Sequence, residues 1–282
     1  MGFFWGRAVS FGLMAMTITG CVSTGQMASQ ERLKSVHNVA VVALLGDNIE
    51  FQSQSLLAGF VGIGATVEEK KVDLGLTKVV ADDVAHLLSR HVNVVAVDTP
   101  ENAHPNTPGP SAPTLEGLRA LGIEPSEQVD TYVIVSPTTF KVVGPGLLLP
   151  NTFAFTGLVV IGGSGNPSLL ATYTASLMDA RTGEIFANGN PQMHKRAMGK
   201  SLPMVGCDGT LLSDTPAATT DAQRQTLTQE FTILLKASLP WALANAGMLS
   251  EAQANEDEAA AGEFTACHRM LASVTNGPSA IR

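Results

Sequence analysis

Apolar residues gather in short runs along the first half of the chain, and three of these runs have the composition of buried strands. They cover residues 36–47, 92–98 and 130–140 and are rich in valine. Branched apolar residues in a nearly unbroken run are typical of a strand that is covered on both faces. We therefore predict a central sheet, which residues 49–54 either extend or join by pairing with the first strand.

Two longer stretches predict helices. Residues 76–91 place apolar side chains three and four positions apart, with charged side chains largely on the opposite face. Residues 221–247 predict a second, longer helix. Thr114 is a suitable N-cap for a short third helix, which Gly122 would end because glycine adopts the left-handed conformation of a helix terminus.

Residues 171–189 alternate between apolar and hydroxyl-bearing side chains, which predicts a β-hairpin. Tyr173, Ala175 and Leu177 fall on one face, and three hydroxyl residues fall on the other. Residues 179–183 supply the turn, because glycine permits a positive φ and an aspartate side chain bonds to the nearby backbone. We interpret the polar residues of this turn as structural, not catalytic.

The order of these elements indicates an α/β protein, with α+β as the alternative. We expect a single domain with a central mixed sheet, helices packed on it and a C-terminal helix. We place this domain at residues 36–247 and expect residues 248–282 to be an acidic, alanine-rich tail. Within that tail, residues 250–262 form either a solvated helix or a disordered spacer.

The amino-terminal residues are typical of a secretory signal peptide. Arg7 precedes an uncharged stretch, residues 8–20, that is too short to span about 30 Å of hydrocarbon as a helix. The stretch ends in Ile18-Thr19-Gly20-Cys21, which resembles the lipobox of bacterial lipoproteins. The alternative is an uncleaved anchor beside a free cysteine.

The lipobox resemblance implies a lipid anchor and a location. Residues 1–20 would be removed, Cys21 would carry acyl chains such as palmitate, and residues 21–35 would form a short polar tether. In lipoproteins an Asp after the cysteine usually retains the protein in the inner membrane, and Val22 stands there instead. The resemblance therefore implies an outer-membrane lipoprotein that faces the periplasm.

The charge balance excludes two classes of partner. Without residues 1–20 the chain keeps 16 basic and 25 acidic residues, a net charge of −9. General nucleic-acid binding needs a basic surface, and adhesion to anionic lipid needs clustered lysine and arginine. We therefore expect no nucleic-acid partner and attachment to the membrane only through the lipid.

Cys207 and Cys267 remain if Cys21 is acylated, an even number in an oxidising compartment. A disulfide between them would close a loop of about 60 residues and stabilise the fold by about 4 kcal/mol in the chain-entropy account. The alternative is a pair of unrelated thiols.

Residues 142–178 contain no charged side chain. Pro150 and the scattered glycines argue against a membrane-spanning helix. Three alternatives stay open: a hairpin inside the core, an apolar surface that meets a partner, and a membrane-inserted hairpin.

A second resemblance concerns the mature domain. The strand ending in Asp179 and the following Ala-Arg-Thr-Gly-Glu hairpin, together with an opening Val-Ala-Val-Val strand, resemble small α/β envelope lipoprotein domains. The curli-secretion lipoprotein family and the amino-terminal domain of the Tol–Pal propeller protein are examples, and the order of elements matches across residues 36–247. The resemblance implies a binding or assembly role with an envelope protein partner, and it leaves an oligomer open.

Motifs for catalysis or metal binding are weak. The six histidines are dispersed, and a zinc site at Cys207, Cys267 and His268 has only one adjacent pair of ligands to support it. Gly199-Lys200-Ser201 lacks the earlier glycine of a phosphate-binding loop. We therefore predict no catalytic residues, metal or cofactor and a protein that acts by binding. The alternatives are a subunit of an oligomeric secretion pore and a periplasmic hydrolase with an unidentified site.

Overall fold

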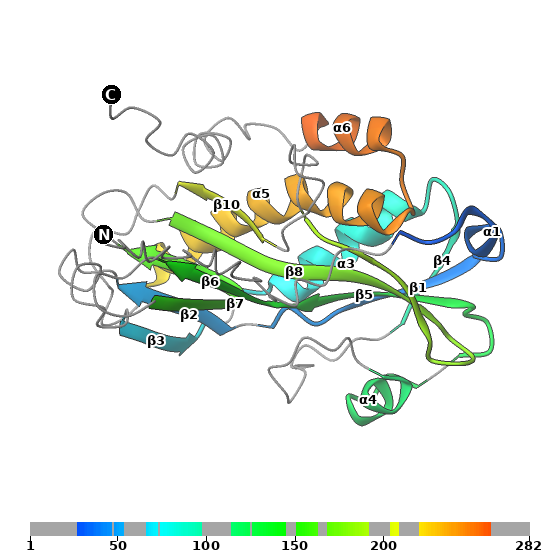
Figure 1. Cartoon of the computed structure of the whole chain (residues 1–282), viewed down its shortest axis with the longest axis horizontal. Coiled ribbons are helices and arrows are strands. Elements are labelled where there is room, and N and C mark those ends of the chain that lie inside the picture. Colours follow the sequence, from blue (N-terminus) through cyan, green and yellow to red (C-terminus); the bar gives the residue numbers. More distant parts are fainter. Residues whose placement is uncertain are drawn as a thin grey trace, which may run out of the picture.

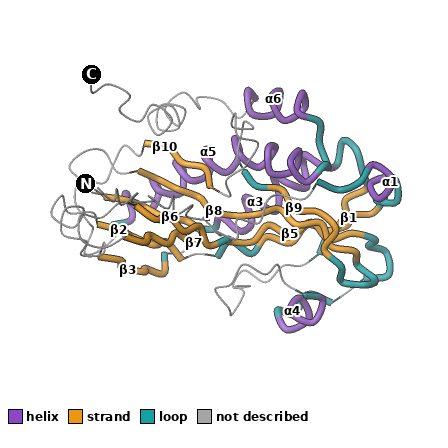
Figure 2. The backbone as a smooth tube through the Cα atoms, viewed as in Figure 1, coloured by secondary structure: helices purple, strands orange, loops and turns teal. Residues whose placement is uncertain are grey.

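The computed structural model shows a mixed sheet with helices on both faces, which confirms the α/β class and the single domain with a C-terminal helix (Figure 1). Helices α3 and α5 cover one face, and α4 covers part of the other (Figures 1 and 2). The residues that the structure describes are 27–46, 48–53, 66–72, 74–97, 114–124, 126–144, 151–162, 168–191, 204–208 and 220–260.

Fifteen elements make up the described chain. The strands are β1 (Asn38–Ala43), β2 (Asn48–Ser53), β3 (Thr66–Lys71), β4 (Asn93–Val95), β5 (Thr131–Pro137), β6 (Thr139–Gly144), β7 (Asn151–Gly162), β8 (Ser168–Asp179), β9 (Ile185–Gly189) and β10 (Met204–Asp208). The helices are α1 (Gln30–Leu33), α3 (Leu76–Leu88), α4 (Leu115–Ala120), α5 (Asp221–Ala246) and α6 (Glu251–Ala260).

Strand β8 lies at the centre of the sheet. The half that ends at Asp179 pairs antiparallel with β5 on one side and β9 on the other. The half that begins at Ser168 pairs antiparallel with β7 and β10. Beyond β5 lie β1 and β4, all three parallel, and beyond β7 lie β2 and then β3. One strand of 12 residues therefore joins two halves of the sheet.

Strands β5 and β7 follow one another along the same side of β8. Pro137 at the end of β5 faces Tyr173, and Gly157 of β7 faces the next residue, Thr172. Between these two points the chain forms β6, which pairs antiparallel with residues 151–156 of β7. Where β7 begins to pair with β8, the chain needs a glycine. Gly157 has a φ of 70°, in the left-handed region that other residues seldom adopt.

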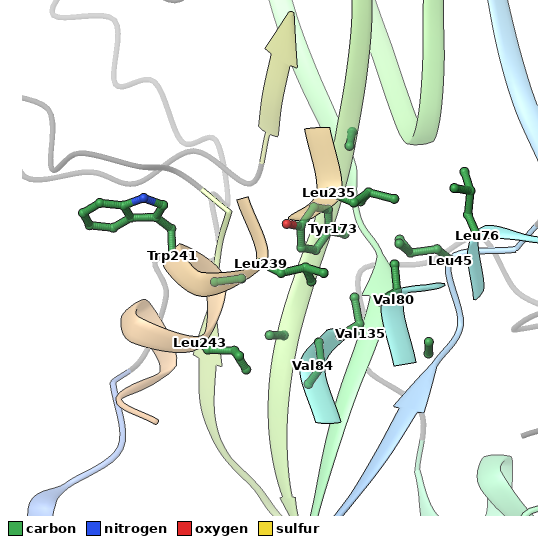
Figure 3. Close-up of a cluster of buried hydrophobic side chains, with 14 of the residues drawn as sticks. Leu45, Leu76, Val80, Val84, Val135, Tyr173, Leu235, Leu239, Trp241 and Leu243 are labelled. Atoms are coloured by element: carbon green, nitrogen blue, oxygen red, sulfur yellow. The ribbon is translucent and has the colours of Figure 1, made fainter. Parts of the chain in front are cut away.

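The apolar face of β8 packs against α5 (Figure 3). Tyr173 lies among Leu235 and Leu239, and its ring is fully buried. The Tyr173 hydroxyl lies 2.6 Å from the hydroxyl of Ser238, which itself donates to the carbonyl of Leu234. Burial raises the pKa of Tyr173 above its ordinary value of 10.0, so the phenol stays neutral and donates to Ser238.

The hydroxyl face of β8 is buried as well, which the alternating pattern alone does not reveal. Thr174 and Ser176 donate to the side-chain oxygens of Asn190 and Asn188 at 3.3 and 2.8 Å. Thr172, Thr174 and Ser176 are each less than a tenth exposed. The contrast along β8 is therefore between an apolar and a hydrogen-bonded buried face, not between core and solvent.

Most sequence predictions of elements are confirmed. The three strands predicted over 36–47, 92–98 and 130–140 correspond to β1, β4 and β5. The helices predicted over 76–91 and 221–247 correspond to α3 and α5. Strand β2 pairs with β3 and β7, so it joins the other half of the sheet and does not extend β1.

The short helix α4 also has the predicted ends. Thr114 accepts a hydrogen bond from the backbone N–H of Gly117 at 3.1 Å, and Gly122 has a φ of 81°.

Packing reaches beyond the expected domain boundaries at both ends. Ala28 is buried, and its N–H donates to the carbonyl of Ala246 at the end of α5 at 3.2 Å. At the other end, α6 buries Ala254 against the domain, and the indole of Trp241 donates to Glu258 at 2.8 Å. Residues 28–35 and 251–260, expected as tether and tail, are therefore part of the folded domain.

The apolar residues of the uncharged stretch whose side chains are described lie in the core. Residues 158–160 of β7 and 169–173 of β8 are at most 4 % exposed wherever they carry apolar side chains. Of the three alternatives, the internal hairpin fits these residues. None of the helices in the described ranges is long and apolar enough to cross a membrane.

We predict that Gly189→Ala destabilises the protein by about 3 kcal/mol or more. A Cβ at Gly189 would overlap the carbonyl oxygen of Ala242 in α5, where both backbones are fixed by the core. Urea unfolding measures the effect. Gly75→Ala is the control, because that site has open space and costs only about 1 kcal/mol for its left-handed φ. Equal costs at the two sites would contradict the close approach of β9 and α5.

Candidate functional site

A cavity of about 730 Å³ opens at the end of the sheet where α1 lies. We call it the α1 cleft. Its walls come from α1 and the turn after it, from the loop at 126–131 that leads into β5, and from the β8–β9 turn at 179–182. Figure 2 shows these loops gathered beside α1. Segments that are far apart in sequence therefore meet around one cavity.

The β8–β9 turn is held by Asp179. Its Oδ1 accepts hydrogen bonds from the backbone N–H groups of Arg181 and Thr182 at 3.0 and 2.8 Å. Its carbonyl accepts from Gly183, whose φ of 74° is the positive value expected for the turn. The predicted turn is therefore present, with Asp179 and Gly183 in the positions that the sequence indicates.

Arg32 connects helix α1 to the β8–β9 turn through ion pairs. Its guanidinium lies 2.8 Å from Asp179 Oδ2 and 3.6 Å from a carboxylate oxygen of Glu184. The same group stands 5.0 Å from the centre of the Phe186 ring on β9, a cation–π distance. Arg32 was missed by the sequence analysis because it lies in the expected tether.

Asp130 connects the loop at 126–131 to the start of β1 by hydrogen bonds. Its Oδ2 accepts from the backbone N–H groups of His37 and Asn38 at 2.9 and 2.8 Å, and its carbonyl accepts from Ala180 at 2.9 Å. Its second carboxylate oxygen, Oδ1, is buried and has no hydrogen-bond partner among the described residues. No local sequence pattern marks Asp130, because the partners of its carboxylate, His37 and Asn38, lie more than 90 positions away.

Competing effects set the pKa of Asp179. Partial burial raises the pKa, but hydrogen bonds from Thr182 and Arg181 and the positive charge of Arg32 outweigh it. The pKa of Asp179 therefore lies below its ordinary value of 3.8, and the carboxylate stays charged at neutral pH.

The lining of the cleft suits hydrogen bonding and ion pairing. Two arginines and three carboxylates face it, and serine, threonine and asparagine side chains lie between them. In the part of the chain that is described, no three His, Cys, Asp or Glu side chains are grouped to hold a metal ion. This arrangement can bind a polar ligand that carries both charges.

The site residues predicted from the sequence are not among the described residues that line the α1 cleft. Cys21 and Cys267 fall outside the described residues, as does His268. Cys207 lies in β10, opposite Leu169 of β8, and its side chain is outside what is described. Acylation, the disulfide and the zinc alternative therefore stay predictions.

Comparison with known proteins gives one structural likeness. No protein-family model matches the chain, and no curated protein sequence matches it significantly. The solved structure of the hypothetical protein CT253 from Chlamydia trachomatis aligns over 78% of this chain and 98% of that chain, with 9% sequence identity and a TM-score of 0.31.

We predict that Asp179→Asn destabilises the protein by about 1–2 kcal/mol at neutral pH, because the amide cannot pair with Arg32 and accepts backbone hydrogen bonds less strongly. The lowered pKa means that the carboxylate stabilises the fold above pH 3.8 and loses this effect as the pH falls through the folded-state value. Urea unfolding at several pH values should show the two proteins converging in acid.

The control for this prediction is Asp82→Asn on α3. The Asp82 side chain is 66% exposed and pairs only with Lys78, so its replacement should change the free energy of unfolding by less than about 0.5 kcal/mol. A difference between wild type and Asp179→Asn that stays constant down to strong acid would contradict the proposed role of the charge.

Proposed function

We propose that this protein is an outer-membrane lipoprotein that faces the periplasm and acts as a binding or assembly module of the cell envelope. The observation that carries the proposal is the position of the lipobox. Ala28, only seven positions after Cys21, is buried in the domain. An acyl-cysteine at that place would anchor a folded domain directly at the membrane surface.

The physics of acylation supports a firm anchor. Each methylene of an acyl chain contributes about 0.8 kcal/mol when it enters the bilayer, so one chain binds reversibly and two or more hold the protein stably. A protein with two or more acyl chains, such as palmitate, on Cys21 therefore needs no membrane-spanning helix to stay at the membrane. After residue 20 the chain has a net charge of −9, so an anionic membrane surface repels it. Insertion of the acyl chains is then the main interaction that holds the protein at the membrane.

The α1 cleft supports a binding role. Its polar and charged groups are positioned by hydrogen bonds to the backbone, as Asp130 and Asp179 show. Such preorganised groups bind a ligand without first having to be ordered. In contrast, the pore-subunit alternative draws on residues 142–178, and the apolar side chains described there are packed inside the domain.

We predict that the intact mass of the membrane-extracted protein corresponds to residues 21–282 plus acyl chains. Cys21→Ala should lack the acyl mass and leave the membrane fraction, because the variant has no acceptor thiol. Intact-protein mass spectrometry and fractionation measure both effects.

Cys207→Ala is the matched control and should keep both the acyl mass and the membrane location. A wild-type chain that still begins at Met1 without acyl chains would overturn the proposed lipoprotein. Retention of Cys21→Ala in the outer membrane at wild-type level would show that another feature anchors the protein.

A further inference from the structure

The length of the tether limits where the membrane can lie. Met27 is six positions after Cys21, and a fully extended chain spans at most about 3.6 Å for each position. An acylated Cys21 therefore lies within about 22 Å of Met27. The end of the domain that carries Met27 must face the bilayer.

That end of the domain carries the α1 cleft. Ala28 bonds to the last residue of α5, and α1 follows directly and supplies Arg32 to the cleft wall. Helix α5 extends from there toward the opposite end of the sheet (Figure 1). With 26 residues it is about 39 Å long. The anchor therefore brings the cleft close to the lipid headgroups and keeps the far end of the domain away from them.

The cleft holds charges of both signs that lack partners within the described chain. Arg181 is exposed, and no described residue pairs with its guanidinium. Glu127 is also exposed beside the cleft, and it too has no partner among the described residues. Asp130, whose carboxylate is held by the backbone N–H groups of His37 and Asn38, adds negative charge to the same wall. A ligand that supplies one acceptor for a guanidinium and one donor for carboxylates would match these groups.

We propose that the α1 cleft binds the headgroup of a zwitterionic phospholipid, phosphatidylethanolamine, in the membrane that carries the anchor. The inference rests on the proposed lipidation of Cys21 and names the ligand of that binding module. The phosphate pairs with the Arg181 guanidinium, which suits oxyanions through its planar fork of donors. The ammonium group donates to Glu127 and lies toward Asp130.

The choice of headgroup follows from charge and hydrogen bonding. The acidic protein repels an anionic headgroup such as phosphatidylglycerol, which also has no ammonium donor. The quaternary ammonium of phosphatidylcholine has no N–H to donate to the carboxylates. A cavity of about 730 Å³ lies in the range of small-molecule sites and has room for the headgroup and its glycerol.

The test is native mass spectrometry of the full membrane-extracted protein ejected from nanodiscs that contain the three lipids in equal amounts. We expect phosphatidylethanolamine to be enriched about tenfold among the retained lipids over the other two. Arg181→Gln and Glu127→Gln should each remove most of the enrichment. Arg119→Gln and Glu116→Gln on α4, exposed and outside the cleft, should leave it unchanged.

Competition distinguishes the sources of the phosphate. Soluble glycerophosphoethanolamine should displace the lipid, whereas inorganic phosphate should not at the same concentration. Equal retention of the three lipids, or displacement by phosphate alone, would overturn the inference. Enrichment that survives both cleft variants would also overturn it, since all four variants change exposed side chains and circular dichroism verifies their folding.

The same spectra separate this inference from the proposed function. Acylated protein without lipid enrichment would overturn the cleft ligand and leave the lipoprotein standing. Enrichment on a chain without acyl groups would leave the ligand standing and overturn the proposed anchor.

Discussion

Strand β8 constrains the rest of the structure, because it pairs with other strands along both edges and its described side chains are buried on both faces. Four strands pair with its two halves, so neither half of the sheet can move without breaking hydrogen bonds to it. On one face Tyr173 bonds to Ser238 of α5, and on the other hydroxyl groups bond to asparagines near β9. Because Gly189 has no side chain, β9 packs directly against the backbone of α5.

The α1 cleft is built on the end of that strand. Asp179, the last residue of β8, fixes the turn through Oδ1 and holds Arg32 through Oδ2. Arg32 in turn holds α1, which continues from the segment that would carry the anchor. Asp130 completes the cleft by joining the loop before β5 to the start of β1. The sheet, the cleft and helix α1, which follows the proposed attachment point, are therefore connected through a few charge-assisted hydrogen bonds.

Sequence patterns predicted the elements that have periodicity and missed those that depend on distant contacts. Helix α3 and strand β1 have long apolar patterns, and Thr114 and Gly122 mark the ends of α4 by local chemistry alone. Helix α1 has four residues, too few to show a helical period, so Arg32 was assigned to a tether. The roles of Asp130 and of the buried hydroxyl face of β8 depend on partners that no local pattern specifies.

The central claim is that the domain is attached at its α1 end, with the cleft toward the bilayer. Nitroxide labels at Lys34→Cys and Asp221→Cys, in acylated protein without Cys207 and Cys267, test it most directly, because both sites are exposed and α5 separates the second from the anchor end. In vesicles, we predict that the label at position 34 collides more with membrane-dissolved oxygen and the label at 221 with a water-soluble nickel chelate. Equal accessibility at the two positions, or the reverse order, would contradict the account.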